Sequence, residues 1–286
     1  MCDCLVALAP ATAEGRTLFA KNSDRPIGEV QHLEWVPARR DEGPVMTTYI
    51  DVEPLHGVTV GALVSRPWWM WGAEHGVNQA GVAIGNATIY TTLDPRAEPA
   101  ALTGMDLVRL GLERATSAGA AVEVITALLE QYGQGGSGHH GADHPYWSSF
   151  LVADAGSAYV LETSGRKWEV EPVADVRATS NRTTIGSFDA AHRHPRQPVE
   201  TLVDPRLRAS NAVLTAAPVN VEGLQAHLRS HAGEQGYSIC MHAPDQETTA
   251  SMIAVLPPGG AMPRVWVASG SPCRTSYVEA DVSPPV

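Results

Sequence analysis

The chain has 286 residues, of which 44% are hydrophobic and 18% charged, with a formal net charge of -11. This composition is typical of a globular protein and argues against an intrinsically disordered chain. The negative charge and the lack of a basic stripe argue against nucleic acid as a partner, because phosphate binding needs clustered Lys and Arg. No apolar stretch approaches the roughly 20 residues that a membrane helix needs, so we expect no membrane partner.

The chain start predicts a cytoplasmic protein. It has no basic segment, and the apolar run over 5–9 is too short for a secretory signal. Thiols stay reduced in the cytoplasm, so we interpret Cys240 and Cys273 as buried thiols rather than a disulfide. Cys2 and Cys4 do not have the CxxC spacing of a redox or zinc motif.

The first residues predict a β-hairpin. Residues 4–10 form a short apolar run that ends at a proline, and 16–21 form a second strand after a turn at Gly15. The polar run over 22–26 is expected to end this second strand as a loop.

Further elements follow in chain order. Apolar residues at helical spacing predict core-facing helices over 104–117 and 120–132. A Gly/His loop is expected over 133–144 and a surface excursion over 189–206. The remaining strands are expected at 46–51, 57–65, 81–91, 149–154, 158–163, 168–172, 176–180, 252–256 and 264–268, with helices at 208–216 and 221–230. This order, without a repeat or linker, indicates a single layered α+β domain over 1–286.

Cys4, on the first predicted strand, is our first candidate for a catalytic group. A thiol is mostly protonated at neutral pH and needs a base to become a nucleophile. A chain cut directly before the cysteine supplies one, because the new α-amine titrates near pH ~8 and is tethered in place.

Other polar residues could complete such a site. The hairpin returns Asp24 to the start of the first strand, where its carboxylate could orient the α-ammonium. Asn86 and Asn181 follow apolar runs, where an amide could stabilise the oxyanion of a tetrahedral intermediate. Each asparagine also has a simpler interpretation as a turn residue.

Three segments carry a family resemblance. They are CLVALAP with FAKNSDRP over 4–26, SRPWWMWGAE over 65–74 and GMDLVRLGLER over 104–114. The chain resembles the secernin-like dipeptidases of the N-terminal-nucleophile (Ntn) hydrolase superfamily from about residue 4 to about residue 275.

The resemblance implies a four-layer αββα sandwich of two antiparallel sheets, and cleavage of amide bonds by an N-terminal cysteine. It places the nucleophile at Cys4, an orienting carboxylate at Asp24, and oxyanion donors at Asn86 and Asn181. It also places a basic residue at Lys21, where the superfamily commonly has Arg, which is able to make a bidentate contact.

Which cysteine becomes the first residue stays open. Cys4 requires loss of a leader, residues 1–3, whereas loss of Met1 alone exposes Cys2. Residues two apart in a strand face the same side, so both thiols are expected in one cleft.

Metal binding and cofactors are not expected. His139, His140, Asp143 and His144 suggest a metal site, but they lie in a Gly-rich loop without the spacing of helical ligands, and the resemblance places no metal there.

The sequence therefore predicts a cysteine amidohydrolase that cleaves a small amide or dipeptide through a thioester. A non-catalytic binding protein with an unprocessed start and an acyltransferase that uses the same cysteine are the alternatives. The partner is a small peptide or amide, and the resemblance is compatible with a homo-oligomer.

Overall fold

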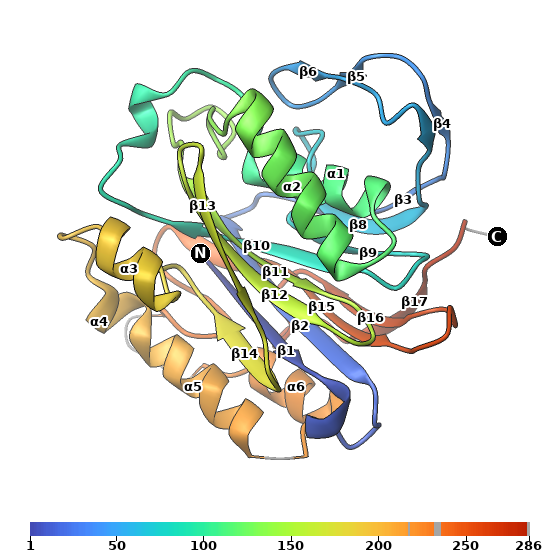
Figure 1. The fold of residues 1–286 in the computed structure, drawn as a ribbon. Coiled ribbons are helices and arrows are strands. Elements are labelled where there is room, and N and C mark those ends of the chain that lie inside the picture. Colours follow the sequence, from blue (N-terminus) through green and yellow to red (C-terminus); the bar gives the residue numbers. More distant parts are fainter. Residues whose placement is uncertain (217, 232–235, 285–286) are drawn as a thin grey trace.

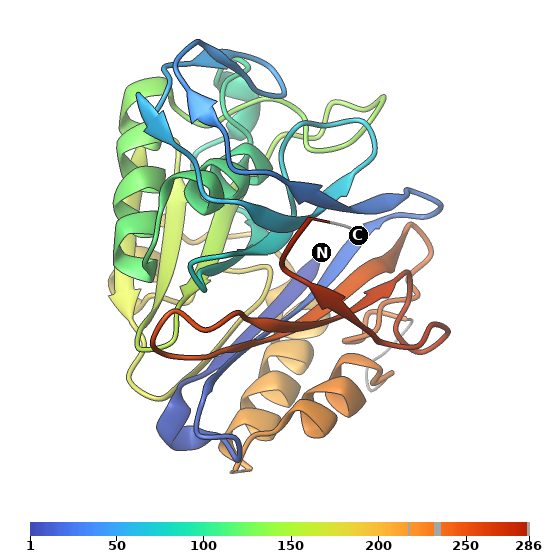
Figure 2. The same cartoon turned by 90° about the vertical axis from the view of Figure 1, so that its right-hand side faces the viewer.

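A computed structural model describes residues 1–216, 218–231 and 236–284. Two antiparallel sheets face each other, and helices cover both outer faces (Figures 1 and 2). The α+β prediction and the four-layer αββα sandwich are confirmed.

The first sheet contains the chain start. Its strands lie in the order β14-β1-β2-β15-β16-β17 within the described residues. Their bounds are β1 (Cys2–Ala7), β2 (Thr17–Pro26), β14 (Val176–Thr179), β15 (Gln246–Leu256), β16 (Arg264–Ser269) and β17 (Val278–Asp281).

The second sheet lies against the inner face of the first, with the order β13-β12-β11-β10-β9-β8-β3 in the described part of the chain. Its strands are β3 (Gln31–Val36), β8 (Ala62–Pro67), β9 (His75–Asn78), β10 (Ala83–Ile89), β11 (Trp147–Ala153), β12 (Ala158–Ser164) and β13 (Lys167–Pro172). Short pairs β4–β7 and β5–β6 project beside it, with bounds Arg40–Asp41, Gly57–Val58, Val45–Met46 and Asp51–Val52.

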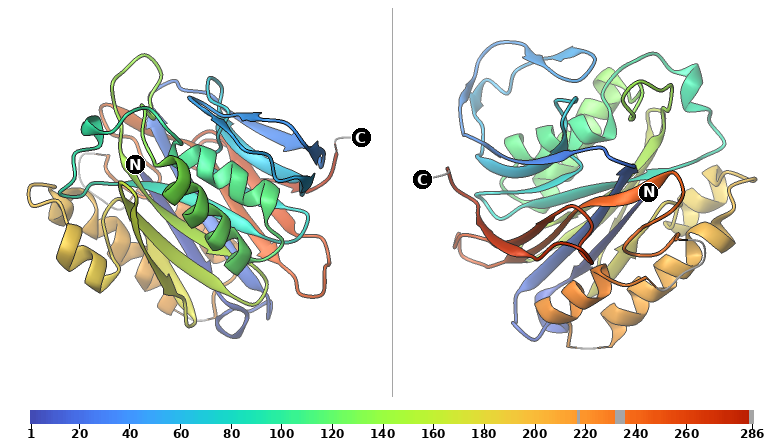
Figure 3. Two further views of the ribbon diagram at one scale, coloured as in Figure 1. Left: turned by 45° about the horizontal axis from the view of Figure 1, so that its top comes forward. Right: turned by 180° about the vertical axis from the view of Figure 1, so that it is seen from behind.

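Two helix layers close the sandwich (Figure 3). Helices α1 (Gly104–Arg114) and α2 (Ala118–Tyr132) cover the second sheet, as predicted. A capping box between Thr103 and Asp106 fixes the start of α1. The first sheet is covered by α5 (Asp204–Thr215) and α6 (Val221–Leu228), which follow α3 (Gly186–His192) and α4 (Val199–Leu202).

The alternation of side chains along β1 explains the continuous apolar run over 4–7. Cys4 and Val6 pack into the core between the sheets, whereas Leu5 and Ala7 pack under the helices. Because both faces of this strand are buried, successive side chains are apolar and do not alternate with polar ones.

The hairpin differs from expectation at its second strand. The prediction that residues 22–26 form a loop is wrong, because β2 continues to Pro26 and pairs with β1 on one side and β15 on the other. Backbone pairing on both edges outweighs the polar composition of Asn22, Ser23 and Asp24, whose side chains find buried partners.

The region 189–206 is also not a plain surface excursion. It contains α4 and the start of α5, and the guanidinium of Arg206 is fully buried. No helix among the described residues combines the length and apolarity that crossing a bilayer requires.

Glu162 fixes the segment that follows β14. Its side chain on β12 is buried, and it accepts hydrogen bonds from Thr184 N (2.6 Å), Thr184 Oγ1 (2.8 Å) and Ile185 N (3.3 Å). Burial raises the pKa of Glu162 from its ordinary value of 4.5 to about 7, although these hydrogen bonds act in the opposite direction.

We predict that the contribution of Glu162 to the stability of the folded protein decreases as pH rises from about 4.5 to about 7. In this window the folded protein binds more protons than the unfolded chain, so the free energy of unfolding falls with pH, by on the order of 3 kcal/mol. Denaturant titrations at several pH values measure this slope. Glu162→Gln should flatten it, whereas the exposed control Glu123→Gln should not. An unchanged slope in Glu162→Gln would contradict the assignment.

Candidate active site

A buried carboxylate, Glu74, lies between the two sheets at the end where the chain begins. Its Oε2 is 3.3 Å from Lys21 Nζ, and its Oε1 is 3.0 Å from Arg25 Nη1. Both cations come from the inner face of β2, and Arg25 also pairs with Glu29 and donates to Gly138 O. Glu74, just before β9 of the second sheet, thus forms ion pairs with two residues of β2 in the first sheet.

The charges of this cluster stabilise each other. Burial by itself raises the pKa of Glu74, but Lys21 and Arg25 outweigh it and hold that pKa below its ordinary value. Burial lowers the pKa of Lys21, but Cys2 and Glu74 outweigh burial and raise it. Glu74 therefore stays ionised and Lys21 stays protonated, although both side chains are buried.

Asn86, on β10, belongs to the same cluster. With its amide oriented to suit its neighbours, Nδ2 donates to Glu74 Oε2 (2.9 Å) and to Glu74 O (3.1 Å). Its amide protons are therefore directed to Glu74.

Cys2 lies beside this cluster. Its Sγ is 3.9 Å from Glu74 Oε2, and its backbone N donates to Asn181 Oδ1 at 2.9 Å. The same amide oxygen accepts from Arg206 Nη2 at 2.9 Å, and Asn181 Nδ2 donates to Thr88 O at 3.0 Å. Asn181 thus holds the backbone of Cys2 rather than offering a free amide donor.

Arg206 ties the helix layer to the chain start. Its Nη1 lies 2.6 Å from Asp3 Oδ2, and both side chains are fully buried. Because Arg206 also binds Asn181, it fixes β1 and the segment after β14 relative to each other.

Cys4 has different surroundings from Cys2. Its side chain is completely buried in the core between the sheets, with Sγ 3.9 Å from Asn86 O. Burial raises the pKa of the Cys4 thiol to about 12, and Lys21 offsets only part of this.

Asp24 lies opposite Met1. Asp24 N donates to Met1 O at 2.8 Å, and Met1 N donates to Asp24 O at 3.0 Å. Its carboxylate accepts from Thr248 Oγ1 at 2.6 Å, and burial raises the pKa of Asp24 to about 6, against the effect of the N-terminal ammonium. Atom Oδ2 of Asp24 has no hydrogen-bond partner among the described residues.

A cavity of about 260 Å³ opens at the chain start. Its walls include Met1, Tyr90, His139, Asn181 and Gln246. The Met1 ammonium donates to Gln246 Oε1 at 2.6 Å, so this chain end lies in the cavity wall. Cys2 is the next residue inward.

The histidines of the Gly/His loop form part of this cavity. The rings of His139 and His144 stack with centroids 4.3 Å apart, and both line it. The prediction of no metal at this loop is not tested by these contacts.

The structure thus gathers Cys2, Lys21, Asp24, Asn86 and Asn181 at one end of the sandwich. Sequence reasoning did not find the roles of Glu74, Arg25 and Arg206. Arg25 follows the predicted Asp24 within the polar run over 22–26, and this neighbour was the available signal. Arg206 gives no such signal, because Asp3 lies 203 residues away in the chain.

Comparison with known proteins supports the fold. No family model matches the sequence. A cysteine-to-alanine mutant of the conjugated bile acid hydrolase from Clostridium perfringens has a TM-score of 0.58 and 12% identity, covering 98% of this chain and 92% of that one. An arginine-to-leucine variant of the same enzyme has a TM-score of 0.59 and 12% identity, covering 99% and 93%.

A third similar structure is the Caenorhabditis elegans N-acylethanolamine-hydrolyzing acid amidase ortholog. Its TM-score is 0.53 with 11% identity, and the match covers 88% of this chain and 92% of that one. The chain therefore shares the fold of these hydrolases over most of its length, and the assignment to the secernin-like family stays a prediction.

Proposed function

We propose that this protein is an Ntn-type amide hydrolase in which Cys2, exposed by loss of Met1, is the nucleophile. The observation that carries the proposal is the position of Cys2. Its nitrogen is held by Asn181, its sulfur lies beside Glu74 and Lys21, and Met1 separates it from a cavity. The hydrolases of similar fold support the same chemistry.

The geometry favours Cys2 over Cys4, our first candidate. Exposing Cys4 would remove residues 1–3, including the buried Asp3–Arg206 ion pair and the pairing of Cys2 and Asp3 with β2. Leaving a buried guanidinium without its partner costs about 3–5 kcal/mol. Loss of Met1 alone preserves these contacts.

The proposed reaction uses the α-amine of Cys2 as the base. The amine takes the thiol proton, and the thiolate attacks the carbonyl carbon of a bound amide. The proton passes to the leaving amine as the C–N bond breaks. Water then hydrolyses the thioester, which releases the acid and restores the thiol.

The neighbouring residues have separate roles in this proposal. Asn181 and Arg206 orient the amine, and Lys21 places a positive charge beside the thiolate. Loss of Met1 also frees the N–H of Asp24, which becomes a candidate oxyanion donor. The oxyanion roles predicted for Asn86 and Asn181 require their amide protons to leave Glu74 and Thr88 O.

Cys2→Ala should abolish amide hydrolysis, whereas Cys4→Ala should retain most of it, since Cys4 serves the core. Liberated amine from a small amide substrate measures turnover. Intact mass of the wild type should show a chain that begins at Cys2. A chain that begins at Cys4, with activity lost only in Cys4→Ala, would transfer the nucleophile to Cys4.

The two alternative functions give different results in the same assay. A non-catalytic binding protein would keep Met1, release no amine and leave thiol-reactive probes unconsumed at Cys2. An acyltransferase would release the leaving amine but transfer the acyl group to a second amine, when one is supplied, in preference to water.

The contacts of Met1 favour a substrate with a free amino group. Its ammonium is held by Gln246 Oε1 (2.6 Å) and Asp24 O (3.0 Å) in the cavity wall. After Met1 is lost, these acceptors are available to a substrate ammonium. We therefore propose small dipeptides as substrates, which agrees with the dipeptidase resemblance.

Leu-Gly should be cleaved in preference to N-acetyl-Leu-Gly. Gln246→Leu should raise KM for the free dipeptide roughly 10- to 100-fold, because a charge-assisted hydrogen bond contributes about 1.5–3 kcal/mol. The neighbouring change Glu247→Gln is the control. Equal cleavage of both substrates would reject amine recognition while leaving amide hydrolysis intact.

A further inference from the structure

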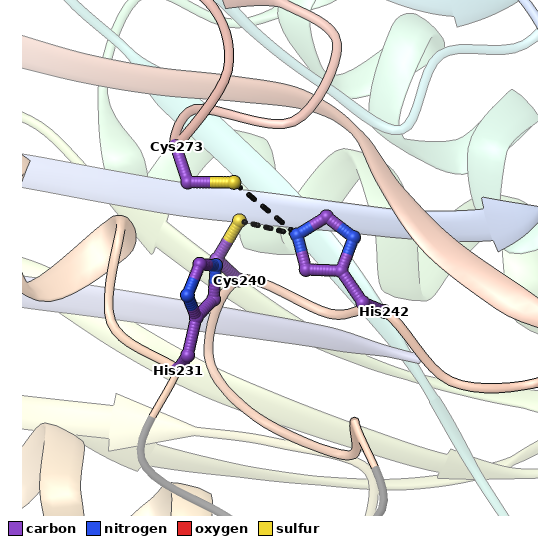
Figure 4. Close-up of side chains that lie close together, drawn as sticks. All are labelled: His231, Cys240, His242 and Cys273. Carbon is purple, nitrogen blue, oxygen red and sulfur yellow. Dashed lines mark hydrogen bonds between the residues drawn. The ribbon is translucent and has the colours of Figure 1, made fainter.

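Four thiol and imidazole side chains converge away from the proposed nucleophile. They are His231, Cys240, His242 and Cys273, here called the thiol–imidazole cluster (Figure 4). One ligand atom from each residue lies within 4.8 Å of all the others. The residues come from the loop after α6, the turn before β15 and the loop after β16.

The distances within the cluster fit a shared metal ion. His242 Nε2 is 3.6 Å from Cys240 Sγ and 3.2 Å from Cys273 Sγ. A tetrahedral zinc ion with ordinary Zn–S and Zn–N bonds separates sulfur from nitrogen by about 3.6 Å. The rings of His231 and His242 lie 5.1 Å apart and edge-on, so they approach from different sides.

A single hydrogen bond of His242 Nε2 accounts for only one of its two sulfur contacts. The single nitrogen Nε2 of His242 faces two sulfur atoms (Figure 4), yet a neutral imidazole nitrogen either donates one proton or accepts one. A cation at the centre of the cluster would satisfy both sulfurs and the nitrogen together.

We propose that the thiol–imidazole cluster binds Zn²⁺ through two thiolates and two neutral imidazoles. Binding releases the two thiol protons, so the ion and its four ligands are neutral overall. Because the protein supplies all four ligands, no position is left for substrate, and the site is structural rather than catalytic. Cys240 is buried and His231 is exposed, which gives the ion an entry path.

The test uses the full-length protein purified under reducing conditions with zinc supplied. Elemental analysis should find one zinc per chain. Cys240→Ser, Cys273→Ser and His242→Ala should each lose most of the metal and lower Tm. The exposed His32→Ala, which leaves the cluster intact, should retain both the metal and the Tm of the wild type.

Cobalt binding can be measured on the wild-type protein, so this readout does not require that the variants fold. The wild-type protein loaded with Co²⁺ should show thiolate-to-metal charge transfer and the intense visible bands of tetrahedral cobalt. Absence of these bands together with absence of bound zinc would overturn the proposal. A disulfide between Cys240 and Cys273 in the reduced preparation, seen as an intact mass two hydrogens lower, would also overturn it. Such a bond removes both thiolates.

Discussion

The structure of this end of the molecule depends on the ion pairs of the buried Glu74 carboxylate. This carboxylate neutralises Lys21 and Arg25, two cations that β2 buries between the sheets, and its Oε2 accepts a hydrogen bond from Asn86 Nδ2. Removing one partner of such a group leaves an uncompensated buried charge, which costs about 3–5 kcal/mol. The inner face of β2 can therefore be polar only because the segment before β9 supplies this carboxylate.

The same arrangement explains why the chain start is held so firmly. Met1 pairs with Asp24, Cys2 with Asn181, and Asp3 with Arg206. Each of these partners belongs to a different part of the chain, so the first three residues connect β2, the segment after β14 and α5. In the proposed mature protein only the contacts of Met1 are lost, and Met1 and its partner Gln246 both line the cavity.

The family resemblance predicted the four layers of the sandwich, whereas the order of elements alone predicted a layered α+β domain. A continuous apolar run marked the first strand, because both of its faces are buried, and apolar residues at helical spacing marked the two helices that cover the second sheet. The pattern failed at residues 22–26, where a central strand carries polar side chains. The buried charges of this strand are paired with Glu74 and hydrogen-bonded to Thr248. Local sequence does not reveal partners so distant in the chain.

The candidate site shows the same division. Lys21, Asp24, Asn86 and Asn181 were named from the sequence and lie together in the structure. The resemblance placed the nucleophile at Cys4 but left open which cysteine becomes the first residue, because Cys2 and Cys4 share one strand face. The choice depends on what surrounds each thiol: a charged cluster and a cavity for Cys2, and an apolar core for Cys4.

The proposed zinc site bears on Asp24 through Thr248. Met241, between two ligands of the thiol–imidazole cluster, donates its N–H to Thr248 Oγ1 at 2.8 Å. Ser271, two residues before Cys273, donates to Thr248 O at 2.9 Å. Since Thr248 Oγ1 accepts from Met241, its own proton is directed to Asp24 Oδ1, 2.6 Å away. An ion that fixes both flanking loops would therefore help to hold the Asp24 carboxylate in place through Thr248, without touching substrate.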